Sequence, residues 1–287
     1  MTLKEFIVPE NAKGLRIETL IRKMVPDFDP AVLREAFSKR DVKLDGIRVK
    51  PDTVAVSGQT VQIFYKEQNK ADKYLNIVFE DENILLINKR AGISVDSDLY
   101  GSHSLLTVCR EYLGNDHFLE ACHRLDNQTS GLCLFAKNEK TYEILLRAFR
   151  ERKIEKYYIC LVRGRMKPPS ATCYAWLKKN STQKRVDILD HPVPGASRII
   201  TEYETIENGD ISRLRIHLLT GKTHQIRAHL SALGHPVLGD DLYGDHTYNR
   251  ESKTQHRLRL CSVSLCIDTH GEIPSLDGRV FSIEPPF

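Results

Sequence analysis

The chain has 287 residues, of which 41% are hydrophobic and 28% charged, with a formal net charge of +4. No run approaches the ~18 apolar residues that cross a membrane, and the first residues lack the apolar core of a signal peptide. These features exclude a helical membrane protein and predict a cytoplasmic protein with one large domain, or one large and one small. The charge is compatible with a polyanionic partner without demonstrating one.

Seven cysteines are present, and none forms a C-x-x-C pair. Most lie in apolar runs such as LCLFA and YICLV. We therefore expect buried free thiols in a reducing compartment.

The first 65 residues contain the signals of two short helices and a hairpin. Residues 15–25 (LRIETLIRKMV) place their apolar groups on one helical face. Asp29 and Pro30 are typical of the N-cap and first turn of a second helix. In DVKLDGIRV, apolar residues alternate on both sides of Asp45-Gly46, which predicts a hairpin.

Cations gather in the second half of this segment, and on charge alone they describe a solvated face. The order of elements over residues 14–65 nevertheless resembles the S4-type RNA-binding domain, in which the second helix and the hairpin grip RNA. The resemblance assigns RNA contacts to Arg34, Lys39, Arg40, Lys43, Arg48 and Lys50. We predict an S4-type domain at 1–66, a polar linker at 67–73 and a catalytic domain at 74–287.

From Tyr74 onward, short strand-like runs dominate: LNIVF, ILLIN, LCLFAK, YYICLV, ATCYAWL, RVDIL, RIITEYE, SRLRIHLL and RLCSVSLCI. Helical patterns interrupt them only at about 139–150 and 224–233. The expected fold class is α+β: a small α/β domain, then a large, mostly antiparallel mixed sheet with helices packed on it.

Two apparent motifs fail on spacing. TGKT (220–223) lacks the glycine that a nucleotide phosphate loop needs at position 216. His224 and His229 lie about 140° apart around a helix, so they do not share a metal easily. We expect neither a metal nor a cofactor.

Two stretches remain as carriers of chemistry. HRLDNQTSG (123–131) combines Arg124 and Asp126 with small polar residues, and residues 214–244 hold THQIR. We expect Thr223 to cap a helix that Gly234 ends. Arg227 would then lie near a helix N-terminus, where a cation is unfavourable, so it needs an acidic partner. Asp126 is available.

These stretches resemble the motifs of RluA-like pseudouridine synthases. HRLDNQTSGL resembles the catalytic motif, KYYICLVRG (156–164) the middle one, TGKTHQIRAHLSALGHPVLGDDLYG the late one, and VFEDENILLINKRAGISV (78–95) the opening segment. The match runs from about 74 to 287. Lys89-Arg90 replaces the usual Lys-Pro, and the late Leu-His-Ala pattern is absent.

The resemblance implies isomerisation of uridine to pseudouridine in structured RNA without cofactor or metal. Asp126 would be the nucleophile, attacking the uracil ring or ribose C1′, and Arg227 would favour its charged form. Tyr158 would stack on the base and take the C5 proton. Arg124 would fill the space of a flipped nucleotide or hold a phosphate.

Three alternatives stay open. The first is a transfer RNA pseudouridine synthase, although the S4-type segment favours ribosomal RNA as substrate over transfer RNA. A retaining glycosidase uses similar chemistry but needs a second carboxylate ~5–5.5 Å from the first. A non-catalytic RNA-binding or ribosome-assembly factor would use the same surface without turnover. We expect a monomer.

Overall fold

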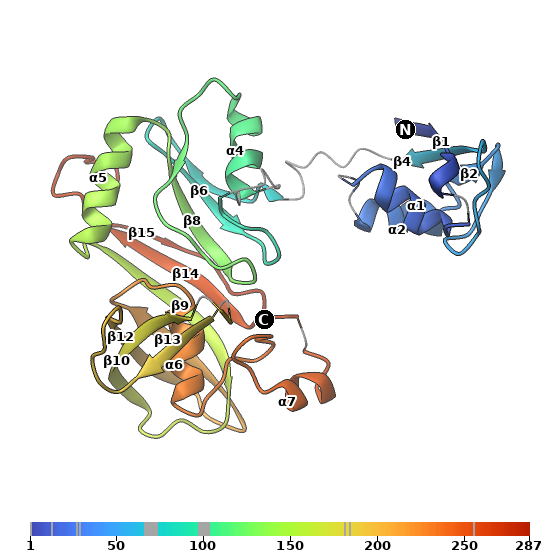
Figure 1. The fold of residues 1–287 in the computed structure, drawn as a ribbon. Coiled ribbons are helices and arrows are strands. Elements are labelled where there is room, and N and C mark those ends of the chain that lie inside the picture. Colours follow the sequence, from blue (N-terminus) through green and yellow to red (C-terminus); the bar gives the residue numbers. More distant parts are fainter. Residues whose placement is uncertain are drawn as a thin grey trace. The chain divides into compact units, whose positions relative to one another are not determined.

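A computed structural model describes residues 2–287, except residues 13, 27, 29, 66–73, 97–103, 181, 184 and 255. The chain divides into two compact units, Met1–Asn69 and Lys70–Phe287 (Figure 1). The predicted linker and the predicted cap Asp29 lie outside the described residues.

The first unit packs two helices on a four-stranded sheet of order β1-β4-β2-β3. Both predicted helices and the hairpin are confirmed, and Asp45 and Gly46 have the positive φ angles, 50° and 80°, that a tight hairpin turn requires. The elements are β1 (Thr2–Ile7), η1 (Glu10–Ala12), α1 (Ile17–Met24), α2 (Pro30–Ser38), β2 (Val42–Leu44), β3 (Ile47–Arg48) and β4 (Thr60–Tyr65). Its core is its own, built around Leu20, Ile21, Leu33 and Ile63.

The second unit is built on one large sheet, in which β11-β10-β12-β13-β9-β14-β8-β6-β5 are neighbours, β15 pairs with β14 and β7 pairs with β8. Only the β14–β8 pair is parallel among the described pairings, which confirms the mostly antiparallel mixed sheet. Its strands are β5 (Ile77–Glu80), β6 (Ile84–Lys89), β7 (Glu120–Ala121), β8 (Ser130–Ala136), β9 (Ile154–Arg163), β10 (Ser170–Asn180), β11 (Arg185–Leu189), β12 (Ser197–Glu207), β13 (Ile211–Leu218), β14 (Leu260–Ile267) and β15 (Arg279–Ser282).

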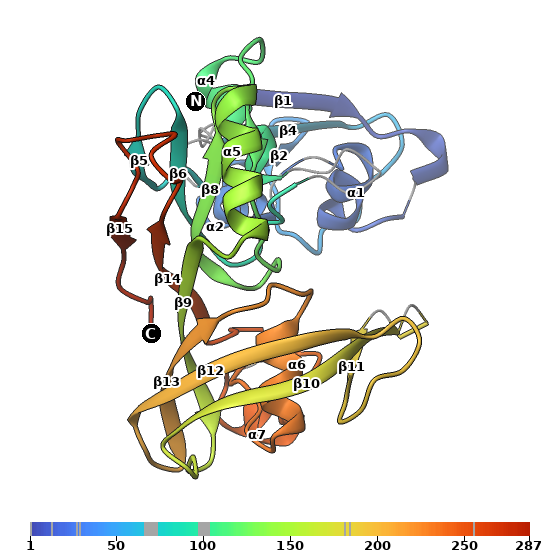
Figure 2. The same cartoon turned by 90° about the vertical axis from the view of Figure 1, so that its left-hand side faces the viewer.

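The two predicted helices of this unit are confirmed as α5 (Glu139–Arg150) and α6 (Gln225–Ala232). Two further helices, α4 (Leu105–Leu113) and α7 (His246–Glu251), were not predicted. Figure 2 shows α5 lying along β8, whereas α6 and α7 lie beside β10 to β13. The end of α5 and residues of β9, β10, β12 and β13 thereby line one cavity.

The central strands are buried on both faces. Leu85 and Ile87 of β6 belong to one core cluster with α4, and Ile84 and Leu86 belong to another with α5. A strand covered on both sides is apolar without alternation, which explains the run ILLIN.

The seven cysteines are free thiols, as predicted, but Cys173 and Cys266 are only partly buried. In the described part of the chain, no helix is long and apolar enough to cross a membrane.

Candidate active site

Asp126 lies in the turn between β7 and β8. The backbone N–H of Thr129 donates to the Asp126 carbonyl at 3.0 Å and closes the turn, while Ser130 already belongs to β8. Gly131 has a φ of 113°, and a Cβ there would lie 2.2 Å from the carbonyl oxygen of Ser262. Only glycine fits this close approach of β8 to β14, so the Thr-Ser-Gly sequence fixes where the loop returns to the sheet.

Lys89 anchors this loop by a hydrogen bond to the Asn127 carbonyl, a role that sequence reasoning missed. Its side chain is fully buried at the end of β6. The ammonium donates to the carbonyls of Arg90, Ile93 and Asn127 at 2.8–3.0 Å, and burial lowers the pKa of Lys89 to about 8. Lys89 therefore ties the segment after β6 to the residue next to Asp126, in a chain where Arg90 stands in place of the usual proline.

Arg227 is the predicted partner of Asp126. Its Nη1 donates to Asp126 Oδ2 at 3.0 Å. The rest of the guanidinium binds Asp240, through Nε to Oδ2 at 2.7 Å and Nη2 to Oδ1 at 2.9 Å. Burial alone would lower the pKa of Arg227, but the two carboxylates outweigh it and raise the pKa. Arg227 therefore stays charged, and it binds one carboxylate oxygen of Asp126, Oδ2.

Asp240 was not predicted. Its side chain is fully buried, with 0% exposure, and its Oδ1 also accepts from the backbone N–H groups of Leu242 and Tyr243. Burial would raise the pKa of Asp240, but Arg227 and these donors lower it overall. The late motif contains this residue, in GDDLYG. That resemblance was the one signal that marked it.

The helix that carries Arg227 begins differently from the prediction. His224, not Thr223, is the N-cap residue, and it has a left-handed backbone with φ 54° and no side-chain capping bond. The Gln225 side chain accepts from Lys222 N and Thr220 Oγ1, so it holds the loop before the helix that Thr223 was expected to cap. The predicted end is confirmed, since Gly234 follows the helix with φ 86°.

His224 extends the network around Asp126. Its Nδ1 lies 3.0 Å from the Tyr243 hydroxyl, which accepts from the backbone N–H of Val186 at 2.9 Å. Its Nε2 lies 4.0 Å from Asp126 Oδ1. Burial lowers the pKa of His224, and the Asp126 carboxylate offsets this only in part. A neutral imidazole therefore faces the carboxylate oxygen that Arg227 does not bind.

Tyr158 lies on β9, opposite Ile216 of β13 and Ser262 of β14. It is 5% exposed, yet it lines the same cavity as Asp126. Burial raises the pKa of the Tyr158 hydroxyl, and the Asp126 carboxylate raises it further. The residue is therefore a neutral phenol at neutral pH, with its ring in the wall of the site.

Arg124 is on the rim. Its side chain is 73% exposed and pairs with Asp96 at 3.2 Å, and it contributes to the cavity wall two residues before Asp126.

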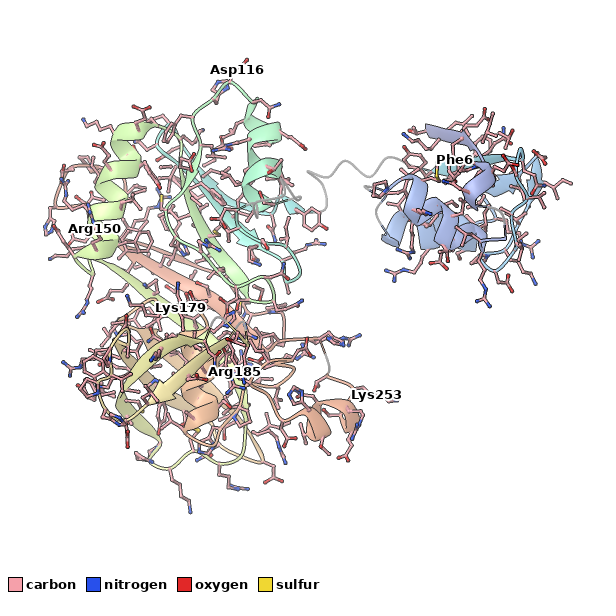
Figure 3. The ribbon with its side chains drawn as sticks, viewed as in Figure 1. Phe6, Asp116, Arg150, Lys179, Arg185 and Lys253 are labelled. Carbon is pink, nitrogen blue, oxygen red and sulfur yellow. The ribbon has the colours of Figure 1, made fainter. Side chains whose placement is uncertain are left out.

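A cavity of about 1220 Å³ contains Asp126, Tyr158 and Arg227. Of the residues described around it, Asp126 is the only acid. Its cations come from several strands, helices and loops of the unit, and Figure 3 labels two of them, Arg150 at the end of α5 and Lys179 on β10. The full set is Arg124, Arg150, Arg152, Lys156, Lys179, Arg198, Lys222 and Arg227. A glycosidase would need a second carboxylate near Asp126 that reaches the substrate. Asp240 is near, because it binds the same guanidinium, but it is fully buried and does not line the cavity.

The six cations assigned to RNA contacts belong to the first unit. Arg34 lies on α2, Lys39 and Arg40 follow it, Lys43 and Arg48 lie on the hairpin strands, and Lys50 comes after β3. Lys39 is in an ion pair with Glu35 at 2.6 Å, and the Lys43 ammonium lies over the Phe64 ring at 4.9 Å. Among the described residues, no His, Cys, Asp or Glu cluster could hold a metal ion.

Comparison with known proteins agrees with this architecture. Residues 83–232 match the family model of RNA pseudouridylate synthase. The ribosomal large subunit pseudouridine synthase C of Vibrio vulnificus is 30% identical over 266 residues, or 88% of this chain and 83% of that protein. Its Escherichia coli K12 namesake is 28% identical over 99% of this chain and 93% of that protein.

Among solved structures, human RNA pseudouridylate synthase domain containing 1 matches with a TM-score of 0.58 and 29% identity, covering 74% of this chain and 90% of that one. The fold and the matched motifs define an enzyme that modifies RNA. The chain belongs to the RNA pseudouridylate synthase family, in its RluA-like branch, whose members isomerise uridine to pseudouridine.

Proposed function

We propose that this enzyme isomerises uridines of large-subunit ribosomal RNA, with Asp126 as the nucleophile. One observation carries the proposal: the only carboxylate in the described wall of a cationic cavity is hydrogen-bonded to a buried arginine. Arg227 Nη1 donates to Asp126 Oδ2, which leaves Oδ1 to attack.

The reaction breaks the bond between uracil N1 and ribose C1′, turns the base and joins C5 to C1′, after which a proton leaves C5. These steps need no redox partner. Asp126 would bond transiently to the uracil ring or to C1′ and be released when the C5 bond has formed. Tyr158 supplies an aromatic wall on which the base stacks, a contact worth ~1–3 kcal/mol.

The proton route follows from the raised pKa of Tyr158. A neutral phenol accepts the C5 proton only if it passes its own proton on. The released Asp126 carboxylate is the acceptor we propose, since it lines the same cavity as Tyr158. Arg124, exposed on the rim, would enter the space that the extruded nucleotide leaves.

The choice of ribosomal RNA rests on two supports. Relatives at 30% and 28% identity bear the name ribosomal large subunit pseudouridine synthase C. The first unit also has the predicted helices and hairpin of an S4-type domain, with cations on both. We propose it as the RNA grip of a monomer in the cytoplasm, since one chain supplies every residue of the described site.

The test measures tritium release from C5-labelled uridine in two transcripts, a large-subunit ribosomal RNA and a transfer RNA. We expect release from the ribosomal transcript. Release from transfer RNA alone would contradict the assigned substrate, and release from neither would favour a non-catalytic RNA-binding factor.

A further inference from the structure

Lys156 has a property that the proposed chemistry does not use. It lies on β9, two residues before Tyr158, and its side chain enters the wall of the catalytic cavity. The ammonium lies 5.7 Å from the centre of the Phe149 ring, and a Cβ at Gly221 would be 3.2 Å from Nζ. Within the described parts of the chain, Lys156 has no hydrogen-bond acceptor and no ion-pair partner.

Two other lysines of this unit, Lys137 and Lys153, have carboxylate partners. Lys137 binds Glu80 at 2.7 Å, and Lys153, just before β9, lies 3.7 Å from Asp268. A partly buried ammonium without an anion is unfavourable, because it loses water without gaining a partner. Burial accordingly lowers the pKa of Lys156.

The neighbours of Lys156 make the local field more positive. Arg150 and Arg152 at the end of α5, and Lys222 in the loop before α6, line the same cavity and have no ion pair among the described residues. His217 is engaged by Glu202 at 2.9 Å. The TGK segment of 220–222, which lacks the spacing of a nucleotide phosphate loop, forms the wall beside Nζ.

We propose that Lys156, with Arg150 and Lys222, forms a phosphate subsite that holds a backbone phosphate of the RNA close to the uridine bound at Asp126. This inference rests on the proposed function. An ammonium that lines the same cavity as the nucleophile and lacks an anion of its own among the described residues fits a phosphate diester group of the substrate. The phosphate supplies the missing partner, and the contact fixes the register of the strand in the cavity.

The test replaces Lys156 with Met, which keeps the length and apolar stem and removes the charge. Lys153→Met is the matched control, because its charge is paired and outside the cavity. With a large-subunit ribosomal RNA transcript, we expect Lys156→Met to weaken binding about tenfold, the effect of one lost charge-assisted contact. The slope of log affinity against log salt should become shallower by about 0.7–0.9, and the control should change neither.

Stability separates this role from a structural one. Removing an unpaired, partly buried charge should leave the melting temperature of Lys156→Met equal to or above that of the unaltered protein. A lower melting temperature with an unchanged salt slope would overturn the subsite.

A second experiment identifies the phosphate. Once tritium release has shown which uridine is modified, single neutral methylphosphonates are placed on either side of it in a short RNA. At one position, the losses of affinity from the neutral linkage and from Lys156→Met should not add, since both remove the same contact. Additive losses at every position would overturn the proposal. If no RNA is modified, the proposed function fails, and the salt slope alone still decides the subsite.

Discussion

Asp240→Asn tests how the nucleophile is held. Asp240 receives two bonds from Arg227, at 2.7 and 2.9 Å, and two from backbone N–H groups. The amide keeps one oxygen acceptor but turns an NH2 group toward groups that only donate. Arg227 would then be a buried cation with Asp126 as its remaining carboxylate partner. The pair of bonds that orients the guanidinium, and with it Nη1 toward Asp126, would be broken.

Removing one partner from a buried ion pair costs about 3–5 kcal/mol. Since asparagine keeps one acceptor, we expect the lower end, about 3 kcal/mol in the free energy of unfolding. At ordinary urea sensitivities this lowers the midpoint by about 1 M or more. We also expect the single-turnover rate of pseudouridine formation to fall by about tenfold or more, because Asp126 loses its orientation.

The single tryptophan makes the assay specific. Trp176 lies on β10, so its fluorescence during urea unfolding follows the second unit alone. Asp241→Asn is the control, since Asp241 is the next residue and pairs with His256 on the surface. A loss below about 1 kcal/mol together with an unchanged rate would refute the reasoning.

The acid dependence of stability checks the same contact. The folded pKa of Asp240 is lowered, so its contribution is complete above the unfolded value of about 3.9 and is lost as pH falls through the folded value. The stability difference between the unaltered protein and Asp240→Asn should therefore shrink below about pH 4. A difference that stays constant down to pH 2 would contradict the lowered pKa.

Three further changes probe other parts of the account. Tyr158→Phe should keep base stacking and slow C5 tritium release, whereas Tyr158→Leu should impair both pseudouridine formation and release; full rates in both would return Tyr158 to a core aromatic. Gly131→Ala should destabilise the second unit by ~1–3 kcal/mol from backbone strain, beyond the clash with Ser262, and unchanged Trp176 unfolding would disprove that constraint. Removing residues 1–69 should leave a folded second unit with weaker RNA binding and a shallower salt dependence, and equal affinity and slope would show that the first unit is no RNA grip.

Local signals in the sequence predicted much of this fold. Asp45-Gly46 specified its own turn, and the apolar runs located the strands because a strand buried on both faces needs no alternation. Helix α4 was missed although Ser104 caps it and Gly114 ends it. Its sequence, LLTVCREYL, is short and rich in apolar and β-branched residues, which do not separate a short helix from a strand.

Site residues were predicted where a sequence motif contains them, and they were missed where their role depends on contacts that only the fold creates. Arg227 needed an acid, and Asp126 was found for it, but the second acid, Asp240, becomes visible only when α6 folds beside the segment after it. Lys89 is similar, since its three acceptors are backbone carbonyls that no side-chain pattern reveals. Thr223 failed as a cap because the Gln225 side chain takes that place in the loop.

The most direct test of the central claim compares single-turnover pseudouridine formation by the unaltered protein, Asp126→Asn and the surface control Asp241→Asn, in the large-subunit ribosomal transcript. The amide of Asp126→Asn is nearly isosteric and still accepts from Arg227, so RNA binding and Trp176 unfolding should change little. Product should be absent in Asp126→Asn and normal in Asp241→Asn. Substantial product from purified Asp126→Asn would contradict the assignment of Asp126 as the nucleophile.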